Sequence, residues 1–132
     1  NEGSSEKSLA DIKAFLSKTG GNCAIACDPN DSPNARPVVE AVAAQNAFIS
    51  TIWNKSDDLH PWDFGDNYVS HMTWSDVKPA EETAEILFKA MGGKGGIVHL
   101  GGIPANNPAV QRLQGLNNAL AKLAEIREGK GE

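Results

Sequence analysis

Short apolar runs and helically spaced apolar stripes alternate along the chain. The continuous run at 23–27 predicts a strand buried on both faces, as in a parallel sheet. Further strands are expected at 47–53, at about 67–74 and at 97–100. Helical spacing predicts helices from Ser8 to Lys18, from Ser32 to about Gln45, from Val77 to Met91 and from Pro108 to about Arg127. This alternation predicts an α/β fold with a mostly parallel sheet flanked by helices.

The order of the predicted elements suggests that the fold is incomplete. An α/β domain of this type normally opens with a strand, whereas this chain opens with a helix, and four strands make a thin sheet. A thin sheet leaves unpaired edges that need covering. We therefore expect part of a larger protein, or a half that another chain completes.

A ligand site is predicted in the stretch 96–120. The apolar run at 97–100 ends in Gly101-Gly102, and a loop then leads through Asn107-Pro108 into a helix that carries Arg112 on its first turns. Ligands of open α/β sheets bind where strands end and helices begin, and helix N-termini offer free N–H groups there. The pattern therefore predicts a small polar ligand, with Arg112 as a fixed donor.

Composition and charge remove two classes of function. The chain has 132 residues and a formal net charge of -5, with basic residues spread singly, which argues against nucleic-acid binding. No run approaches the roughly 18–20 apolar residues of a membrane helix.

Cys23 and Cys27 lie on one strand face about 13 Å apart, too far for a disulfide.

Motifs for catalysis, metal binding or phosphate binding are not matched. His60, His71 and His99 lack metal-ligand spacing, and His71 and His99 are expected inside strands. The glycines at 92–96 lack the Ser or Thr that follows the lysine in a phosphate loop. No nucleophile elbow of the form G-x-S-x-G is present. We therefore expect neither metal nor cofactor.

Four segments carry a resemblance to a known family: CAIACDPNDSPNARPVVEAV, AFISTIWNK, YVSHMTWSD and GGIVHLGGIPANNPAVQRLQGLNNAL. In these segments, and from about Ser8 to the C-terminus, the chain resembles the ribose- and galactose-type periplasmic sugar-binding proteins of ABC transporters. Their type I periplasmic-binding-protein fold is shared with the effector domains of LacI-type repressors. The last segment is the most specific, because its arginine follows the strand at a set distance.

The resemblance implies an architecture and a function. Family members close two α/β lobes on a sugar, and this chain matches the later part of the first lobe (1–92) and the opening β-α unit of the second (93–132). The implied function is to bind a monosaccharide or related polyol in the periplasm, without chemistry. The implied partners are the sugar and the membrane permease of an ABC transporter, with no nucleic acid.

The resemblance also implies ligand-binding residues. Asp28 stands where relatives bond sugar hydroxyls, and Trp53 and Asn54 stand where many relatives carry an Asp-Arg pair. This departure suggests that an aromatic ring stacks on a sugar face. Trp74 falls where a residue often approaches the ligand. In the second lobe, Ile103 and Arg112 match an apolar contact and a hydroxyl-binding arginine.

Physical chemistry supports the same residue types. A sugar presents an apolar C–H face and a rim of hydroxyls, which call for flat aromatic rings and for carboxylate, amide or guanidinium groups. The tryptophans Trp53, Trp62 and Trp74 supply the rings, although Trp62 is expected to anchor its loop on the lobe. The long polar loop at 54–66 that carries Trp62 is itself typical of functional loops.

Two other functions stay open at this point. The first is the effector-binding domain of a LacI-type regulator, which would need a basic helix-turn-helix headpiece upstream. The second is a small α/β enzyme with His60, Asp63 or Asp28 as acid–base groups, although no spacing pairs these groups.

Overall fold

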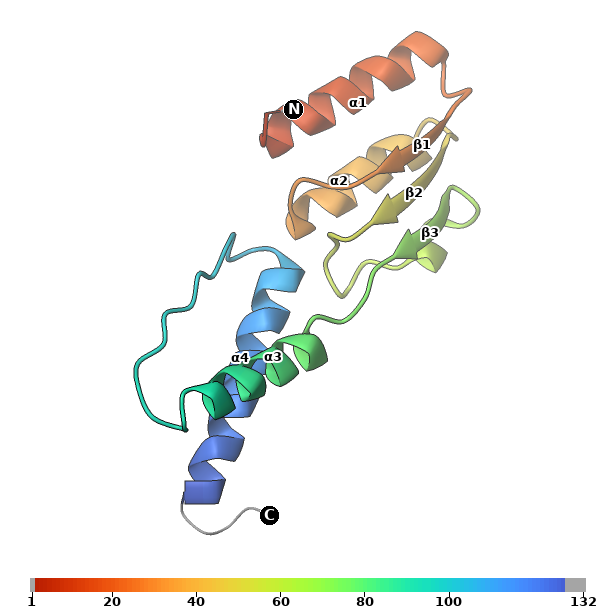
Figure 1. The fold of residues 1–132 in the computed structure, drawn as a ribbon. Coiled ribbons are helices and arrows are strands. Elements are labelled where there is room, and N and C mark those ends of the chain that lie inside the picture. Colours follow the sequence, from red (N-terminus) through yellow and green to blue (C-terminus); the bar gives the residue numbers. More distant parts are fainter. Residues whose placement is uncertain (1, 128–132) are drawn as a thin grey trace. The chain divides into compact units, whose positions relative to one another are not determined.

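The computed structural model describes residues 2–127. The element order is α1 (Ser5–Thr19), β1 (Ala24–Cys27), α2 (Ser32–Ala43), β2 (Phe48–Ile52), the 3-10 helix η1 (Pro61–Phe64), β3 (Tyr68–Met72), α3 (Val77–Ala90) and α4 (Asn107–Arg127) (Figure 1). Contacts divide the described residues into two compact units. Unit 1 comprises 2–74 with 105–107, and unit 2 comprises 75–104 with 108–127.

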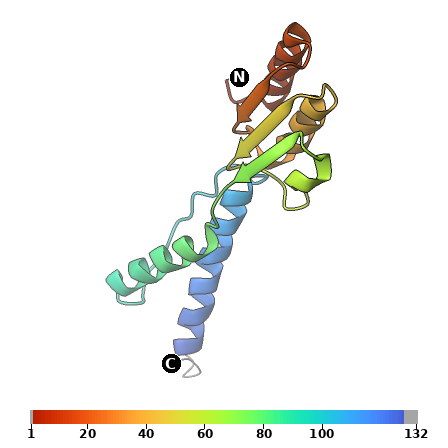
Figure 2. The same ribbon diagram turned by 90° about the vertical axis from the view of Figure 1, so that its right-hand side faces the viewer.

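Unit 1 is built on a three-stranded parallel sheet in the order β1-β2-β3. The three arrows run side by side in the same direction in Figure 2. Cys27 pairs with Thr51, and Thr51 pairs with His71, so these three residues form one row across the sheet. The α/β class and the parallel sheet that the sequence predicted are confirmed.

The sheet is buried on one face. Apolar side chains of α1 and α2 pack on that face around Ile49 and Tyr68. The core residues buried there are Leu16, Ala35, Val38, Val39, Val42, Ala47, Ile49, Leu59 and Tyr68. The opposite face, hereafter the open face, exposes Phe48, Ile52, Val69 and Met72. The prediction that the strands are buried on both faces is wrong. A continuous apolar run does not show whether helices cover one face of the sheet or both.

Side-chain caps fix the starts of α1 and α2. Ser4 Oγ accepts a hydrogen bond from the N–H of Lys7, and Asp31 Oδ1 accepts one from the N–H of Asn34 at 2.8 Å. α1 therefore begins three residues before the start expected at Ser8, whereas α2 begins at Ser32, as expected. A capping Asp or Ser lies just outside the helix, and its side chain accepts a hydrogen bond from the free N–H three residues later. The helix therefore starts at the residue after the cap.

Unit 2 holds α3 against the part of α4 from Pro108 onward. The contact is close at Gly115, where an added Cβ would lie 2.3 Å from the carbonyl oxygen of Val77 and 2.8 Å from Ala80 Cβ. Ala84, Phe88 and Ala119 are the buried apolar residues of this helix pair. The expected ranges of both helices are confirmed within one residue.

The fourth strand expected at 97–100 is absent, which corrects that prediction. Residues 96–103 carry no regular secondary structure, and Val98 and Leu100 are each 91% exposed. A strand is stabilised by hydrogen bonds to a neighbouring strand, and unit 2 contains no strand among its described residues. The lobe boundary expected between 92 and 93 remains a prediction, whereas compactness divides the chain near Ser75.

No described helix combines the length and the apolar content that crossing a membrane requires.

Candidate functional site

The carboxyl ends of the three strands bring four of the predicted site residues to one edge of unit 1. Asp28 follows β1, Trp53 and Asn54 follow β2, and Trp74 lies two residues after β3. Because parallel strands end at the same edge of a sheet, these residues form one group, which we term the strand-end rim.

Asp28 and Asn54 contact each other across the first two strand ends. Asn54 Nδ2 donates to the carbonyl oxygen of Pro29 at 2.9 Å and lies 3.4 Å from Asp28 Oδ1. Asn54 is only 8% exposed, and its Oδ1 is buried with no hydrogen-bond partner among the described residues. A buried acceptor without a donor costs about 1–3 kcal/mol, so a donor such as a buried water is favoured at this oxygen.

The carboxylate of Asp28 stays open to solvent on one side. Partial burial raises its pKa above the ordinary value, and the hydrogen bond from Asn54 acts in the opposite direction. In the part of the chain that the structure describes, no Lys, Arg or His nitrogen lies within ion-pair distance of Asp28. The carboxylate can therefore accept hydrogen bonds from an incoming group.

Trp53 and Trp74 form an aromatic pair at the rim. Their ring centroids lie 4.8 Å apart with the planes at 68°, in an edge-to-face arrangement. Both indoles are partly exposed, Trp74 more than Trp53. Such a pair offers an apolar surface on which a ring with C–H groups can stack.

The backbone of Trp53 is held in the left-handed region, with φ at +69°. The N–H of Trp53 donates to the carbonyl oxygen of Met72 at 2.9 Å, and Thr73 Oγ1 donates to the carbonyl oxygen of Trp53 at 3.3 Å. A bulky residue in this conformation costs about 1–3 kcal/mol, and such strain clusters at functional sites. Thr73 thus takes part in the rim, a role that the sequence pattern did not reveal.

Arg112 is held by an acid that sequence reasoning also missed. Arg112 Nη2 lies 3.1 Å from Asp76 Oδ2, and the N–H of Asp76 donates to Gln111 Oε1 at 2.8 Å. Asp76 occupies the position before α3, and its side chain makes no capping bond. Acids at helix starts are common caps, so spacing alone could not assign this one to Arg112.

Arg112 and Ile103 belong to unit 2. Arg112 lines a shallow cleft of about 440 Å³ that α3, α4 and residues 97–100 enclose, with Leu87, Ile97 and Leu116 on its walls. Ile103 is exposed and does not line this cleft. The structure therefore groups Asp28 with Asn54, and Trp53 with Trp74. A shared site with Arg112 and Ile103 remains a prediction.

A second polar group lies on the helix-covered face of the sheet. Thr51 Oγ1 is 2.5 Å from the Tyr68 hydroxyl and 2.8 Å from His71 Nδ1, while His71 Nε2 is buried without a partner among the described residues. Burial lowers the pKa of His71, and the charge of Lys55 lowers it further. His71 is therefore a neutral histidine within a strand, as expected, whereas His99 lies exposed outside any strand, contrary to expectation.

The loop at 54–66 departs from expectation at Trp62. This side chain is 75% exposed and stacks on His60 with ring centroids 4.5 Å apart, so it does not anchor the loop. Leu59 and Phe64 take that role, since Leu59 is fully buried and Phe64 packs on Tyr68. The pattern of a loop with several apolar residues did not show which of them points inward.

Within the described part of the chain, no group of three or more His, Cys, Asp or Glu side chains is arranged to hold a metal ion. Cys23 and Cys27 are free thiols, and both pack against the core on the helix-covered face.

No protein-family model matches the sequence, and no curated protein matches it. Among solved structures, a close similarity is found to the crystal structure of a twin-arginine translocation pathway signal protein from Burkholderia phytofirmans, with 57% sequence identity and a TM-score of 0.88. The match covers 93% of this chain and 38% of that protein, so this chain spans well under half of the relative's length.

Proposed function

We propose that this chain is part of a solute-binding protein that holds a monosaccharide or a related polyol without transforming it. The bound sugar is delivered to the membrane permease of an ABC importer. The observation that supports the proposal is the strand-end rim, where Asp28 contacts Asn54 and, at the same edge of the sheet, Trp53 contacts Trp74.

The chemistry of the strand-end rim suits a carbohydrate. The indole pair can stack on the C–H face of a sugar ring, while the carboxylate of Asp28 accepts hydrogen bonds from hydroxyl groups. As a further part of the proposal, Arg112 supplies donors in a geometry that Asp76 fixes, and Ile103 supplies an apolar contact. Recognition of this kind needs no nucleophile or acid–base pair, which supports binding without chemistry.

Export to the periplasm is part of the same proposal. The relative from Burkholderia phytofirmans is described as a signal protein of the twin-arginine translocation pathway, which is an export route. An exported protein fits a solute-binding role better than the effector domain of a LacI-type regulator, which would act on DNA inside the cell. The periplasmic location and the permease as partner rest on this argument and on the resemblance.

Tryptophan fluorescence and calorimetric titration with a panel of pentoses, hexoses and polyols test the proposal. We expect saturable binding and a shift in emission, since two of the three tryptophans lie at the rim. Trp53→Gly should abolish binding while keeping the local backbone, because glycine adopts the positive φ without strain. Trp62→Ala is the matched control and should bind normally, since Trp62 lies outside the rim.

Two results would count against the proposal. A lack of response to every sugar and polyol would remove the carbohydrate function, and a sugar that is recovered chemically altered would reinstate an enzyme. Arg112→Ala adds a test of the second unit. It should weaken binding at least about tenfold with little loss of stability, and unchanged affinity would remove Arg112 from the site.

A further inference from the structure

Asp28 and Asn54 present acceptor oxygens at the strand-end rim. Asn54 uses its Nδ2 on the carbonyl oxygen of Pro29 and on Asp28, which fixes the orientation of the amide and leaves Oδ1 without a donor. Asp28 offers its carboxylate oxygens, and Asn54 is its hydrogen-bond partner among the described residues. Asn54 Oδ1 thus lacks a donor among the described residues, on a side chain that is more than nine-tenths buried, whereas Asp28 Oδ1 accepts from Asn54 and the Asp28 carboxylate forms no ion pair there.

The number of hydrogen-bond donors distinguishes two candidate ligand groups, a hydroxyl and a primary ammonium. A hydroxyl group donates one hydrogen bond, whereas a primary ammonium group donates three and carries a positive charge. An ammonium placed at Asp28 can direct both its charge and its donors at the carboxylate, whose Oδ1 also accepts from Asn54 Nδ2. Bonds between ionised partners are about twice as strong as neutral ones.

The charged and aromatic residues at the strand-end rim also favour a primary ammonium group. Lys55 is the cationic side chain nearest to Asn54 in sequence, but its Nζ donates to the carbonyl oxygen of Ser56 at 3.1 Å and its charge acts on His71. The negative charge of Asp28 is therefore not neutralised by the described chain. The faces of the Trp53 and Trp74 rings attract cations through their π-systems.

We propose that the strand-end rim binds its ligand through a primary ammonium group, so that the carbohydrate it takes is an amino sugar rather than a neutral sugar. This inference rests on the proposed function, because it names the class of sugar for the same site. The ammonium group contacts the Asp28 carboxylate, Asn54 positions that carboxylate, and the sugar ring stacks on the indole pair.

The test compares matched ligands by calorimetric titration near neutral pH. The probes are glucosamine and galactosamine, their neutral parents glucose and galactose, and N-acetylglucosamine, in which the amine is an uncharged amide. Cyclohexylammonium is added as a ring with an ammonium group and no hydroxyls. We expect at least one amino sugar to bind about tenfold or more tightly than both its parent and the acetylated form.

Two variants assign the preference to the rim. Asp28→Asn keeps the shape and removes the charge, so the ratio of affinities for amino and neutral sugar should fall toward one. Asp63→Asn is the control, because Asp63 bonds to the N–H of His60 in the 54–66 loop and lies outside the rim. A preference that survives Asp28→Asn would reflect the acidic charge of the whole chain and would overturn the inference.

The remaining outcomes separate this inference from the proposed function. Neutral sugars that bind as tightly as amino sugars would overturn the ammonium site and leave the sugar-binding function intact. Cyclohexylammonium binding that depends on Asp28, with no sugar binding at all, would keep the ammonium site and remove the carbohydrate function. Failure of every probe would remove both.

Discussion

Unit 1 and unit 2 both contain amphipathic helices, but the helices of unit 1 pack against a sheet and those of unit 2 pack against each other. In unit 1, α1 and α2 cover a sheet, and nine buried residues form one continuous core. In unit 2, two helices face each other with three buried apolar residues, and α3 and α4 are also joined by polar contacts. The comparison shows that a sheet gathers apolar side chains from several segments, whereas a lone helix pair depends on close approach and paired charges.

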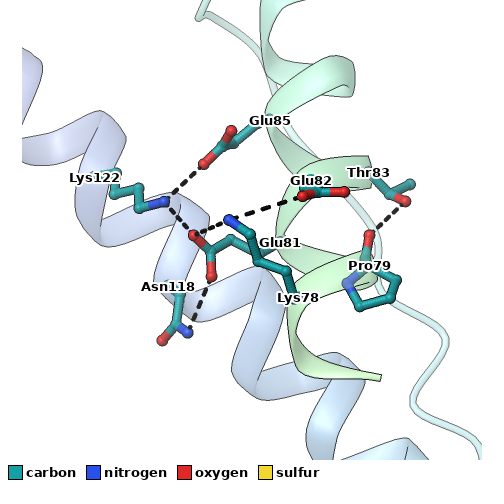
Figure 3. A network of polar contacts seen from close by, with 8 residues as sticks. All are labelled: Lys78, Pro79, Glu81, Glu82, Thr83, Glu85, Asn118 and Lys122. Carbon is teal, nitrogen blue, oxygen red and sulfur yellow. Dashed lines mark hydrogen bonds and ion pairs between the residues drawn. The ribbon is translucent and has the colours of Figure 1, made fainter. Parts of the chain in front are cut away.

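The charge network of unit 2 makes this difference concrete. Lys122 on α4 contacts both Glu81 and Glu85 on α3, and Asn118 donates to Glu81 (Figure 3). The hydrogen bond from Lys122 is the main cause that lowers the pKa of Glu81, and the same contact raises the pKa of Lys122. Glu81 is only 7% exposed, but the Lys122 side chain is half exposed, so solvent screens its ion pairs and they add little stability.

The largest expected effect is in the core of unit 1. Leu59→Ala should lower the free energy of unfolding by about 2–5 kcal/mol, because it leaves a cavity beneath the 54–66 loop. Leu87→Ala on the half-exposed surface of α3 should cost less than about 1 kcal/mol. Urea unfolding measures both. Tryptophan emission reports unit 1 alone, since all three tryptophans lie there. Equal costs for the two variants would contradict the comparison.

The next effect concerns the close helix contact of unit 2. Gly115→Ala should destabilise the α3–α4 pair by about 1–3 kcal/mol, since the new methyl group would collide with backbone atoms of α3. Gly96→Ala is the control, because an added Cβ meets no atom within 4 Å there. Helical circular dichroism should then show earlier melting while tryptophan emission is unchanged. A single coincident transition would show that the two units unfold together.

A smaller effect is expected from acid on His71. Its pKa is lowered in the folded state from an ordinary value of 6.5, so the unfolded chain binds the proton more readily. Stability is therefore fully present above about pH 6.5 and is lost as the pH falls through the folded-state pKa. His71→Gln should flatten this dependence in urea unfolding, while His99→Gln, at an exposed histidine, should retain it. A dependence unchanged by His71→Gln would show that another group is responsible.

The smallest effect is expected where the predicted strand failed to form. Val98→Pro should change stability by less than about 0.5 kcal/mol, because residues 97–100 have no ladder hydrogen bonds to lose. Ser50→Pro in the central strand β2 is the contrasting variant and should cost about 3 kcal/mol or more. Strong destabilisation by Val98→Pro would indicate that this segment pairs as a strand in solution.

Much of the fold followed from the sequence, and less of the site did. The ranges of β2, β3, α3 and α4 were predicted closely because each carries its own apolar periodicity. Asp28 and Asn54 were assigned to one ligand site by the family resemblance, and they are in contact. The ion pair between Asp76 and Arg112 was not predicted, because an acid at a helix start is ordinarily interpreted as a cap.

The sequence by itself determined the helices, the three strands and the polar residues at the strand ends, because periodicity and chain punctuation act within a few residues. The tertiary structure alone decided that one face of the sheet is open, that residues 97–100 stay unpaired and that Trp53 adopts a left-handed turn. Each of these outcomes depends on neighbours that come from distant parts of the chain. Hydrogen bonds and packing between segments far apart in the sequence leave no local sequence pattern from which they could be predicted.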